Sequence, residues 1–198
     1  LATLHPLYKV GDQLVEAIQS HETVSQSEAR KRAISLLRSV RIPNAESRID
    51  SYPYELSGGM RQRVGIAMAL ANDPDVIIAD EPTTALDVTI QAQILNLMNK
   101  LKSETGAAIL FITHDLGVIA ETCEEVVVMY AGKVAEIASA SDLFRNPKHP
   151  YTQGLLDSIP RLETPRKTRL NIIQGIVPSF YDIPSGCRFR NRCPRVMD

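Results

Sequence analysis

The stretch Val76-Ile77-Ile78-Ala79-Asp80-Glu81-Pro82 decides the fold class. Its apolar residues form a short unbroken run, which is typical of a strand buried on both faces of a parallel sheet. Two acidic residues follow directly, and an acid at the tip of such a strand typically holds Mg²⁺ for phosphoryl transfer. The second acid could position or deprotonate an attacking water. Taken alone, the same pattern also fits a solvated strand end with a charged turn.

The segments around this stretch predict a parallel α/β sheet covered by helices, because strands with buried runs alternate with helices. An antiparallel hairpin turned through Ala131-Gly132 is expected at one edge of that sheet. The expected elements are helices within 1–56, over 57–71, over 88–102 and just after Asp115, and strands over 76–79, 107–112, 125–130 and 133–137.

Two more sites lie where ligands bind in such folds. Leu56-Ser57-Gly58-Gly59-Met60-Arg61-Gln62 stands directly at a helix start, where free N–H groups suit a phosphate. Ser57 is a good cap, and two glycines let a ligand approach the backbone. Thr113-His114 ends the second strand, and His114 could donate to a γ-phosphate. Alone, the first pattern is more often a cap without a ligand, and the second a structural histidine.

Composition excludes several classes of protein. The chain has 198 residues, 44% of them hydrophobic and 23% charged, which suits one soluble domain with or without a short appendage. Disordered, collagen-like and disulfide-dense chains are excluded. The formal net charge of −1 excludes a globally basic nucleic-acid binder. No apolar run approaches the ~20 residues of a membrane helix.

The end of the chain differs from the rest, because residues 159–198 carry eight basic and three acidic side chains. Its basic residues, from Arg166 to Arg195, could touch anionic headgroups or nucleic acid, but a solvated face or packing on a partner subunit is the better prediction. The odd number of cysteines favours a reducing compartment. Cys123, on an expected helix, is interpreted as structural.

The order and spacing of these motifs resemble the nucleotide-binding domain of ABC ATPases over roughly residues 50–140. Leu56–Gln62 is similar to the signature motif of that family, and Val76–Glu81 to its Walker B motif with the catalytic glutamate. Ala85-Leu86-Asp87 is similar to the D-loop, and His114 to the switch histidine. The resemblance implies an α/β P-loop NTPase fold with a helical subdomain, a parallel-sheet core and a C-terminal extension.

The flanks resemble the importers of dipeptides, oligopeptides or nickel within that family. Leu4-His5-Pro6 is similar to the stretch after the Q-loop, and residues 146–152 to the link between core and extension. Cys187 and Cys193 lie in a segment that resembles the cysteine-bearing end of that extension. Thiolates at short spacing can hold zinc or an iron–sulfur cluster, and two are too few, so a [4Fe-4S] cluster is expected only in a longer protein. Free thiols are the alternative.

The resemblance also implies roles for the motif residues. Two such domains sandwich two ATP molecules, each between the Walker motifs of one subunit and the signature of the other. Asp80 would help hold Mg²⁺, Glu81 would act on the hydrolytic water, and His114 would contact the γ-phosphate. The residues expected at the partner's ATP or at the dimer interface are Ser57, Gly58, Gly59, Met60, Gln62 and Asp87.

The phosphate-binding Walker A motif, Gly-x-x-x-x-Gly-Lys-Ser/Thr, does not occur in the sequence. The chain is therefore interpreted as an incomplete, C-terminal piece that lacks Walker A and the Q-loop and does not turn over ATP alone. Three parts are expected: a helical subdomain with the signature over 1–72, the Walker B, D-loop and switch-histidine part over 73–158, and the extension over 159–198.

The leading hypothesis is the ATPase subunit of a bacterial peptide importer, peripheral on the cytoplasmic side of the inner membrane. Its implied partners are a second ATPase subunit, identical or related, two permease subunits and, indirectly, a solute-binding protein; nucleic acid is not expected. The alternatives are a soluble ABC ATPase of DNA repair or translation, and a truncated module that only dimerises. The transported solute stays open.

Overall fold

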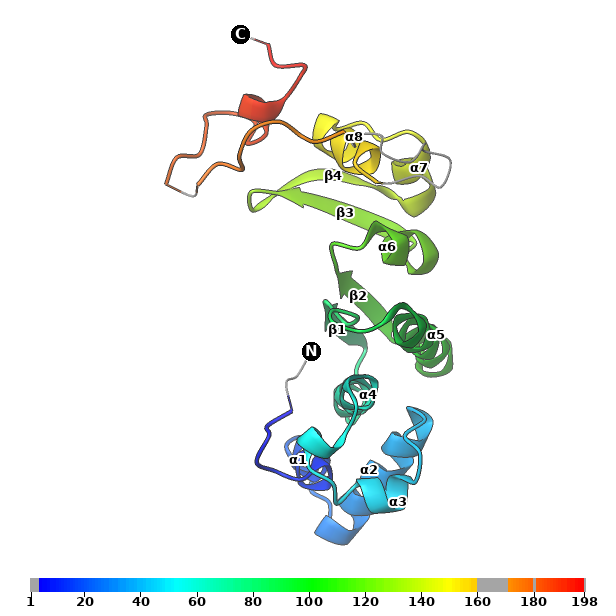
Figure 1. Cartoon of the computed structure of the whole chain (residues 1–198). Coiled ribbons are helices and arrows are strands. Elements are labelled where there is room, and N and C mark those ends of the chain that lie inside the picture. The colour runs from blue at the N-terminus through cyan, green and yellow to red at the C-terminus, as the bar shows by residue number, and fades with distance from the viewer. Residues whose placement is uncertain (1–3, 160–170, 180, 198) are drawn as a thin grey trace. The chain divides into compact units, whose positions relative to one another are not determined.

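Helices make up the first part of the chain in the computed structural model, which describes residues 4–159, 171–179 and 181–197 (Figure 1). Their buried residues recur every four positions, as Leu14 and Ile18 do in one helix and Ala33 and Leu37 in the next, so each helix turns one stripe inward. The elements are α1 (Val10–Gln19), α2 (Gln26–Ser39), α3 (Ala45–Arg48), the 3-10 turn η1 (Pro53–Glu55) and α4 (Gly58–Ala69).

A parallel strand pair follows these helices. Strand β1 (Val76–Asp80) pairs with β2 (Ala108–Ile112), and the connection between them is the long helix α5 (Val88–Thr105). Helix α5 ends at Gly106, whose φ of 74° is the left-handed conformation that glycine adopts without steric cost. The strand–helix–strand order predicted from the sequence is therefore confirmed.

The strands differ from the prediction in their burial. Ile77 and Ala79 of β1 pack in the core, but Val76 and Ile78 are 56% and 63% exposed. Leu110 and Ile112 of β2 are exposed in the same way. The expectation of strands buried on both faces is wrong for the described residues, because the core residues of α4 and α5 gather on one face of the strand pair only.

The second half begins with α6 (Leu116–Thr122) and a hairpin of β3 (Glu125–Tyr130) and β4 (Lys133–Ser139). Ala131 and Gly132 both have positive φ, at 46° and 77°, as a two-residue hairpin turn requires. Among the described strands, β3 pairs with β4 and β1 pairs with β2. The hairpin strands and their turn are as predicted, and the placement of the hairpin at the edge of the parallel sheet stays a prediction.

Two short helices, α7 (Ala140–Arg145) and α8 (Pro150–Asp157), follow the hairpin. The carboxylate of Glu136 on β4 accepts hydrogen bonds from the N–H groups of Lys148 and His149, at 2.7 and 3.0 Å. These groups stand directly before α8, so Glu136 fixes the start of that helix against the strand. Cys123 is half-buried against a small cluster of Val126, Ala140 and Leu143, in keeping with a structural role.

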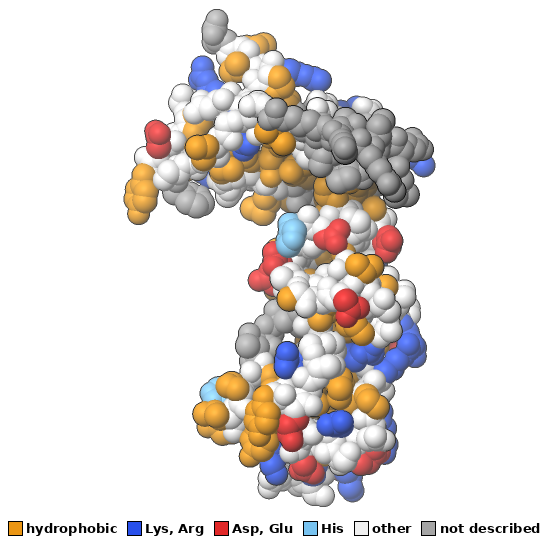
Figure 2. Space-filling model, in the orientation of Figure 1, with side chains coloured by type: hydrophobic (Ala, Val, Ile, Leu, Met, Phe, Trp, Pro, Cys, Tyr) orange, Lys and Arg blue, Asp and Glu red, His pale blue; other side chains and the backbone are white. Residues whose placement is uncertain are grey.

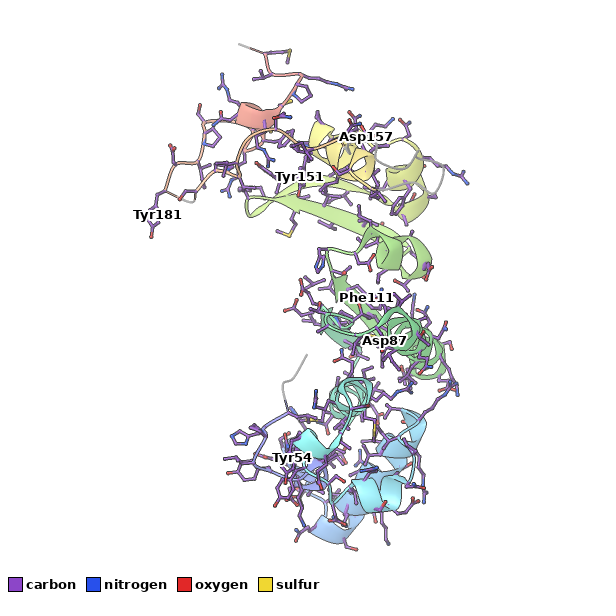
Figure 3. The ribbon with its side chains drawn as sticks, viewed as in Figure 1. Tyr54, Asp87, Phe111, Tyr151, Asp157 and Tyr181 are labelled. Carbon is purple, nitrogen blue, oxygen red and sulfur yellow. The ribbon has the colours of Figure 1, made fainter. Side chains whose placement is uncertain are left out.

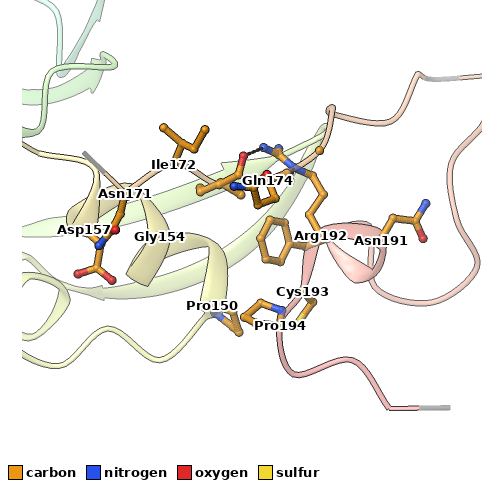
Figure 4. Close-up of a pocket in the computed structure, with 13 residues that line it drawn as sticks. Pro150, Gly154, Asp157, Asn171, Ile172, Gln174, Asn191, Arg192, Cys193 and Pro194 are labelled. Atoms are coloured by element: carbon orange, nitrogen blue, oxygen red, sulfur yellow. Dashed lines mark hydrogen bonds between the residues drawn. The ribbon is translucent and has the colours of Figure 1, made fainter. Parts of the chain in front are cut away.

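The basic end of the chain packs on this half of the protein through Phe189, which is 2% exposed and contacts the rings of Tyr130 and Tyr151. The Arg192 guanidinium donates to the carbonyls of Gln174 and Ile173 at 2.8 and 2.9 Å, beside a surface pocket that also includes Cys193 (Figure 4). A solvated face is thus the wrong expectation for the Arg192 guanidinium, and packing of the basic end on a partner subunit stays a prediction. Arg166, Lys167 and Arg169 lie outside the described residues.

The chain divides into two compact units between Leu116 and Gly117. The boundaries expected from the sequence, after residues 72 and 158, fall inside these units, and the three-part division stays a prediction. Every described helix is too short or too polar to cross a bilayer.

Candidate functional site

The acidic pair lies at the carboxyl edge of β1 and β2. Asp80 is in register with Ile112, the last residue of β2, and the N–H of Glu81 donates to the Ile112 carbonyl at 2.8 Å. That bond extends the strand pairing by one residue and brings Glu81 beside His114. Figure 2 shows that a histidine and acidic side chains lie at the surface of the middle part of the chain.

Glu81 holds its carboxylate between two side chains. Its Oε1 lies 3.0 Å from Nδ1 of His114, and its Oε2 accepts a hydrogen bond from the Thr84 hydroxyl at 2.9 Å. These two hydrogen bonds lower the pKa of Glu81 below its ordinary value, and the bond from Thr84 has the larger effect. Glu81 and His114 are both exposed. The edge therefore presents an ionised carboxylate with a fixed orientation, open to a water molecule or a phosphate.

The turn that carries Glu81 is strained. Glu81 has a φ of 45°, a left-handed conformation that is uncommon for any residue with a side chain. Such strain persists only where the surroundings fix the backbone, and it is frequent at functional sites. Asp80, by contrast, ends the strand with an exposed carboxylate. Carboxylate oxygen is the donor that Mg²⁺ prefers, so Asp80 fits the predicted metal contact.

Ser57 and the two glycines open α4, as expected. The Ser57 hydroxyl accepts a hydrogen bond from the Met60 N–H at 3.3 Å, which caps the helix. The structure adds a reason for Gly59 besides ligand approach, because a Cβ there would lie 2.7 Å from Cγ2 of Ile90 on α5. Met60 itself is half-buried against the core.

The Gln62 side chain has a partner inside the chain. Its Nε2 donates to the carbonyl of Pro82, the residue after Glu81. Sequence reasoning predicted a nucleotide contact for Gln62 and missed this bond, as it missed the Thr84 hydroxyl. The one available signal was a hydroxyl residue three positions after Glu81, within reach of a local turn contact.

Asp87 lies at the start of α5 (Figure 3) and caps it, since its Oδ1 accepts from the Ile90 N–H at 2.9 Å. Its predicted position at a dimer interface stays a prediction. One carboxylate oxygen is engaged within the helix, and the residue is exposed.

The cysteines offer no complete cluster site. Cys187 is exposed, Cys193 is half-buried, and both are free thiols. Within the described part of the chain, no group of three or more histidine, cysteine or acidic side chains could hold a metal ion. Two thiolates do not satisfy a [4Fe-4S] cluster, which needs four ligands, so these residues do not by themselves fit the group.

Two family models match the chain. The model described as "ABC transporter" matches residues 5–84, and the one described as "Oligopeptide/dipeptide transporter, C-terminal region" matches residues 135–198. Curated relatives match nearly the whole chain. A protein of Sinorhizobium fredii named a probable peptide ABC transporter ATP-binding protein is 55% identical, over 98% of this chain and 58% of its own length.

Two further relatives carry similar names. A dipeptide transport ATP-binding protein of Haemophilus influenzae is 52% identical over 98% of this chain and 58% of its own length. An oligopeptide transport ATP-binding protein of Mycobacterium tuberculosis is 52% identical over 100% of this chain and 32% of its own length. The chain thus spans less than three fifths of the length of these relatives.

A solved structure is also similar. It is a dimeric ATP-binding cassette in a post-hydrolysis state, bound to ADP and Pi, with a TM-score of 0.61 and 32% identity. The match covers 71% of this chain and 61% of that one.

Proposed function

The chain belongs to the ATP-binding proteins of ABC transporters, and on that premise we propose that it supplies two parts of an ATPase that drives peptide uptake. One part is the edge of the β1–β2 pair that carries Asp80, Glu81 and His114, and the other is α4, the signature helix, which begins at the predicted signature motif. The observation that carries the proposal is the Glu81 carboxylate, oriented by Thr84 and His114 beside Asp80 at the carboxyl edge of the strand pair.

In this proposal each group at the edge has one task. Glu81 would accept a proton from the attacking water, and His114, whose Nδ1 lies 3.0 Å from that carboxylate, would contact the γ-phosphate. Asp80 would hold Mg²⁺, which when bound neutralises charge on the phosphates. The phosphate-binding loop with its lysine would come from outside these 198 residues, because their sequence holds no such motif.

The start of α4 would serve a second nucleotide. Ser57 and the free N–H groups behind it form a phosphate-binding helix terminus, which the sandwich of two ATPase subunits places on the partner's ATP. Met60 and Asp87 would lie along that dimer interface. The similar dimeric cassette bound to ADP and Pi supports such a pairing.

The transport role follows from the relatives. Their names specify peptide, dipeptide and oligopeptide transport, so the proposed cargo is a peptide, moved by two permease subunits that receive it from a solute-binding protein. The ATPase would then act at the cytoplasmic face of the bacterial inner membrane. A [4Fe-4S] cluster at Cys187 and Cys193 would need ligands beyond the two present here.

Complementation tests the proposal. Residues 1–198 are mixed with the part of the Sinorhizobium fredii relative that lies outside the match, and release of phosphate from Mg-ATP is measured. We expect turnover from the mixture, turnover lower by about a hundredfold or more with Glu81→Gln, and none from residues 1–198 alone. Equal turnover by the Glu81→Gln mixture would contradict the assignment. A mixture that dimerises without any turnover would favour a non-catalytic module.

A further inference from the structure

The side chain of Gln62 connects the start of α4 to the turn that carries Glu81. Gln62 lies in the second turn of α4, is half-buried, and donates from Nε2 to the Pro82 carbonyl. Pro82 is buried and has no N–H of its own, so its carbonyl is the group through which a neighbouring helix can hold this residue.

The turn needs such an anchor because its backbone is strained. Glu81 has a φ of 45°, and Ala85, four residues later, has a φ of 62°. Within the turn, the Thr84 N–H donates to the Glu81 carbonyl at 3.2 Å, and the Glu81 N–H donates to β2. Gln62 adds a bond from a different helix, at the residue next to the carboxylate.

The same helix contacts the following segment at three more points. Leu86 lies against Gly58, at 3.6 Å from the position of an added Cβ, and Ile90 lies against Gly59. One turn further along, Arg63 donates to the Gln93 side chain at 3.1 Å. The start of α4 therefore packs closely on residues 86–93, the segment that follows the Glu81 turn.

We propose that Gln62 is a positioning residue for Glu81: it holds the Glu81–Pro82 turn against the signature helix, so that a phosphate bound at Ser57 and the general base move together. This rests on the function proposed above. It is an alternative to the nucleotide contact predicted for Gln62, because one N–H of the amide is already bonded to Pro82.

Amide hydrogen exchange in the 198-residue chain tests the link without any nucleotide. Gln62→Met keeps the length of the side chain and removes the donor. The matched control is Gln93→Met, which removes another bond between α4 and this segment but does not touch Pro82. We expect the Glu81 and Thr84 amides to exchange about fivefold to tenfold faster in Gln62→Met, as loss of one hydrogen bond allows, and unchanged in Gln93→Met.

Two results would overturn the link. One is unchanged exchange at Glu81 in Gln62→Met, and the other is an equal acceleration in Gln93→Met, which would mean that helix packing alone fixes the turn. Should Gln62→Met fail to fold, Gln62→Glu replaces it, since its carboxylate keeps the same length and has no proton to donate at neutral pH.

The complemented ATPase gives the second measurement. There Gln62→Met should lower kcat about tenfold and leave KM for ATP unchanged, because Gln62 acts on the base and not on nucleotide binding. A raised KM with normal kcat would restore the nucleotide contact and overturn the proposal. If the wild-type mixture shows no turnover but Gln62→Met still changes amide exchange at Glu81, the proposed ATPase function is contradicted and the link between Gln62 and Glu81 is not.

Discussion

Gly59 shows how tightly the start of α4 packs against α5. Gly59→Ala would place a Cβ 2.7 Å from Cγ2 of Ile90, which is held in place because a β-branched side chain has one strongly preferred χ1 rotamer in a helix. Overpacking of this kind costs about 1–3 kcal/mol and exceeds the gain of about 1 kcal/mol from replacing a helical glycine by alanine. We therefore expect Gly59→Ala to lower the free energy of unfolding in urea by about 1 kcal/mol.

The neighbouring glycine is the matched control. A Cβ at Gly58 would make an ordinary contact of 3.6 Å with Leu86, so Gly58→Ala should be neutral or slightly stabilising. Combining Gly59→Ala with Ile90→Ala should cost less than the two single changes added together. Equal effects of alanine at both glycines, or strict additivity with Ile90→Ala, would show that Ile90 is not the obstacle.

For individual residues, the sequence predicted where the site residues lie better than it predicted their hydrogen-bond partners. Asp80, Glu81 and His114 were expected at one edge because parallel strands end together, and the structure brings Glu81 and His114 to 3.0 Å. The bond of Gln62 was not predictable, because it depends on a left-handed turn at a glutamate, which no local pattern signals. For Thr84 the one signal was its position three residues after Glu81.

Among the elements, α5 begins at a cap that also lies in the predicted D-loop. Asp87→Ala removes the acceptor of the Ile90 N–H and should destabilise the chain by about 1 kcal/mol. Asp87→Asn keeps an acceptor of the same shape and should retain most of that stability. Urea unfolding of both variants checks this, and an equally large loss for asparagine would show that charge, and not capping, is what Asp87 provides.

The attachment of α8 to β4 should depend on pH. Burial acts to raise the pKa of Glu136, but hydrogen bonds, those from the N–H groups of Lys148 and His149 among them, outweigh it and lower the pKa overall. A lowered pKa in the folded state means that the contribution is present above the ordinary pKa of a glutamate and is lost as pH falls through the folded-state pKa.

Glu136→Gln tests this dependence. We expect it to lower the free energy of unfolding by about 1–2 kcal/mol at neutral pH, because it removes a charge that accepts two N–H bonds at a helix start. The difference from the wild-type chain should shrink as the pH is lowered toward 3. Glu121→Gln, at an exposed position on α6, serves as the control and should change little at either pH. A loss that is constant with pH would contradict the electrostatic account.

The elements themselves were largely predictable, and their burial was not. Gly106 and Ala131-Gly132 marked the end of α5 and the hairpin turn because the backbone there needs positive φ. The periodicity of hydrophobic residues could not distinguish a strand that is covered on both faces from one that is covered on a single face, because an unbroken apolar run such as Val76–Ala79 suits both.

For the whole molecule, the division between Leu116 and Gly117 predicts two unfolding steps. Leu14 is fully buried in the first unit and Phe189 is 2% exposed in the second. Leu14→Ala and Phe189→Ala should each cost about 3–5 kcal/mol, and each should destabilise only its own unit. Hydrogen exchange along a urea series measures both units at once. A single step in which either substitution destabilises every amide would show that the units unfold together.

The left-handed backbone at Glu81 has a practical consequence for anyone who evolves this protein toward heat resistance. Glycine adopts a φ of 45° freely, whereas glutamate pays about 1 kcal/mol for it. In Glu81→Gly the relief of that strain is offset by the loss of the bonds to Thr84 and His114, each of about 1 kcal/mol, so a screen for thermal tolerance alone would not protect the carboxylate. Melting temperature would then say little about whether this position still works.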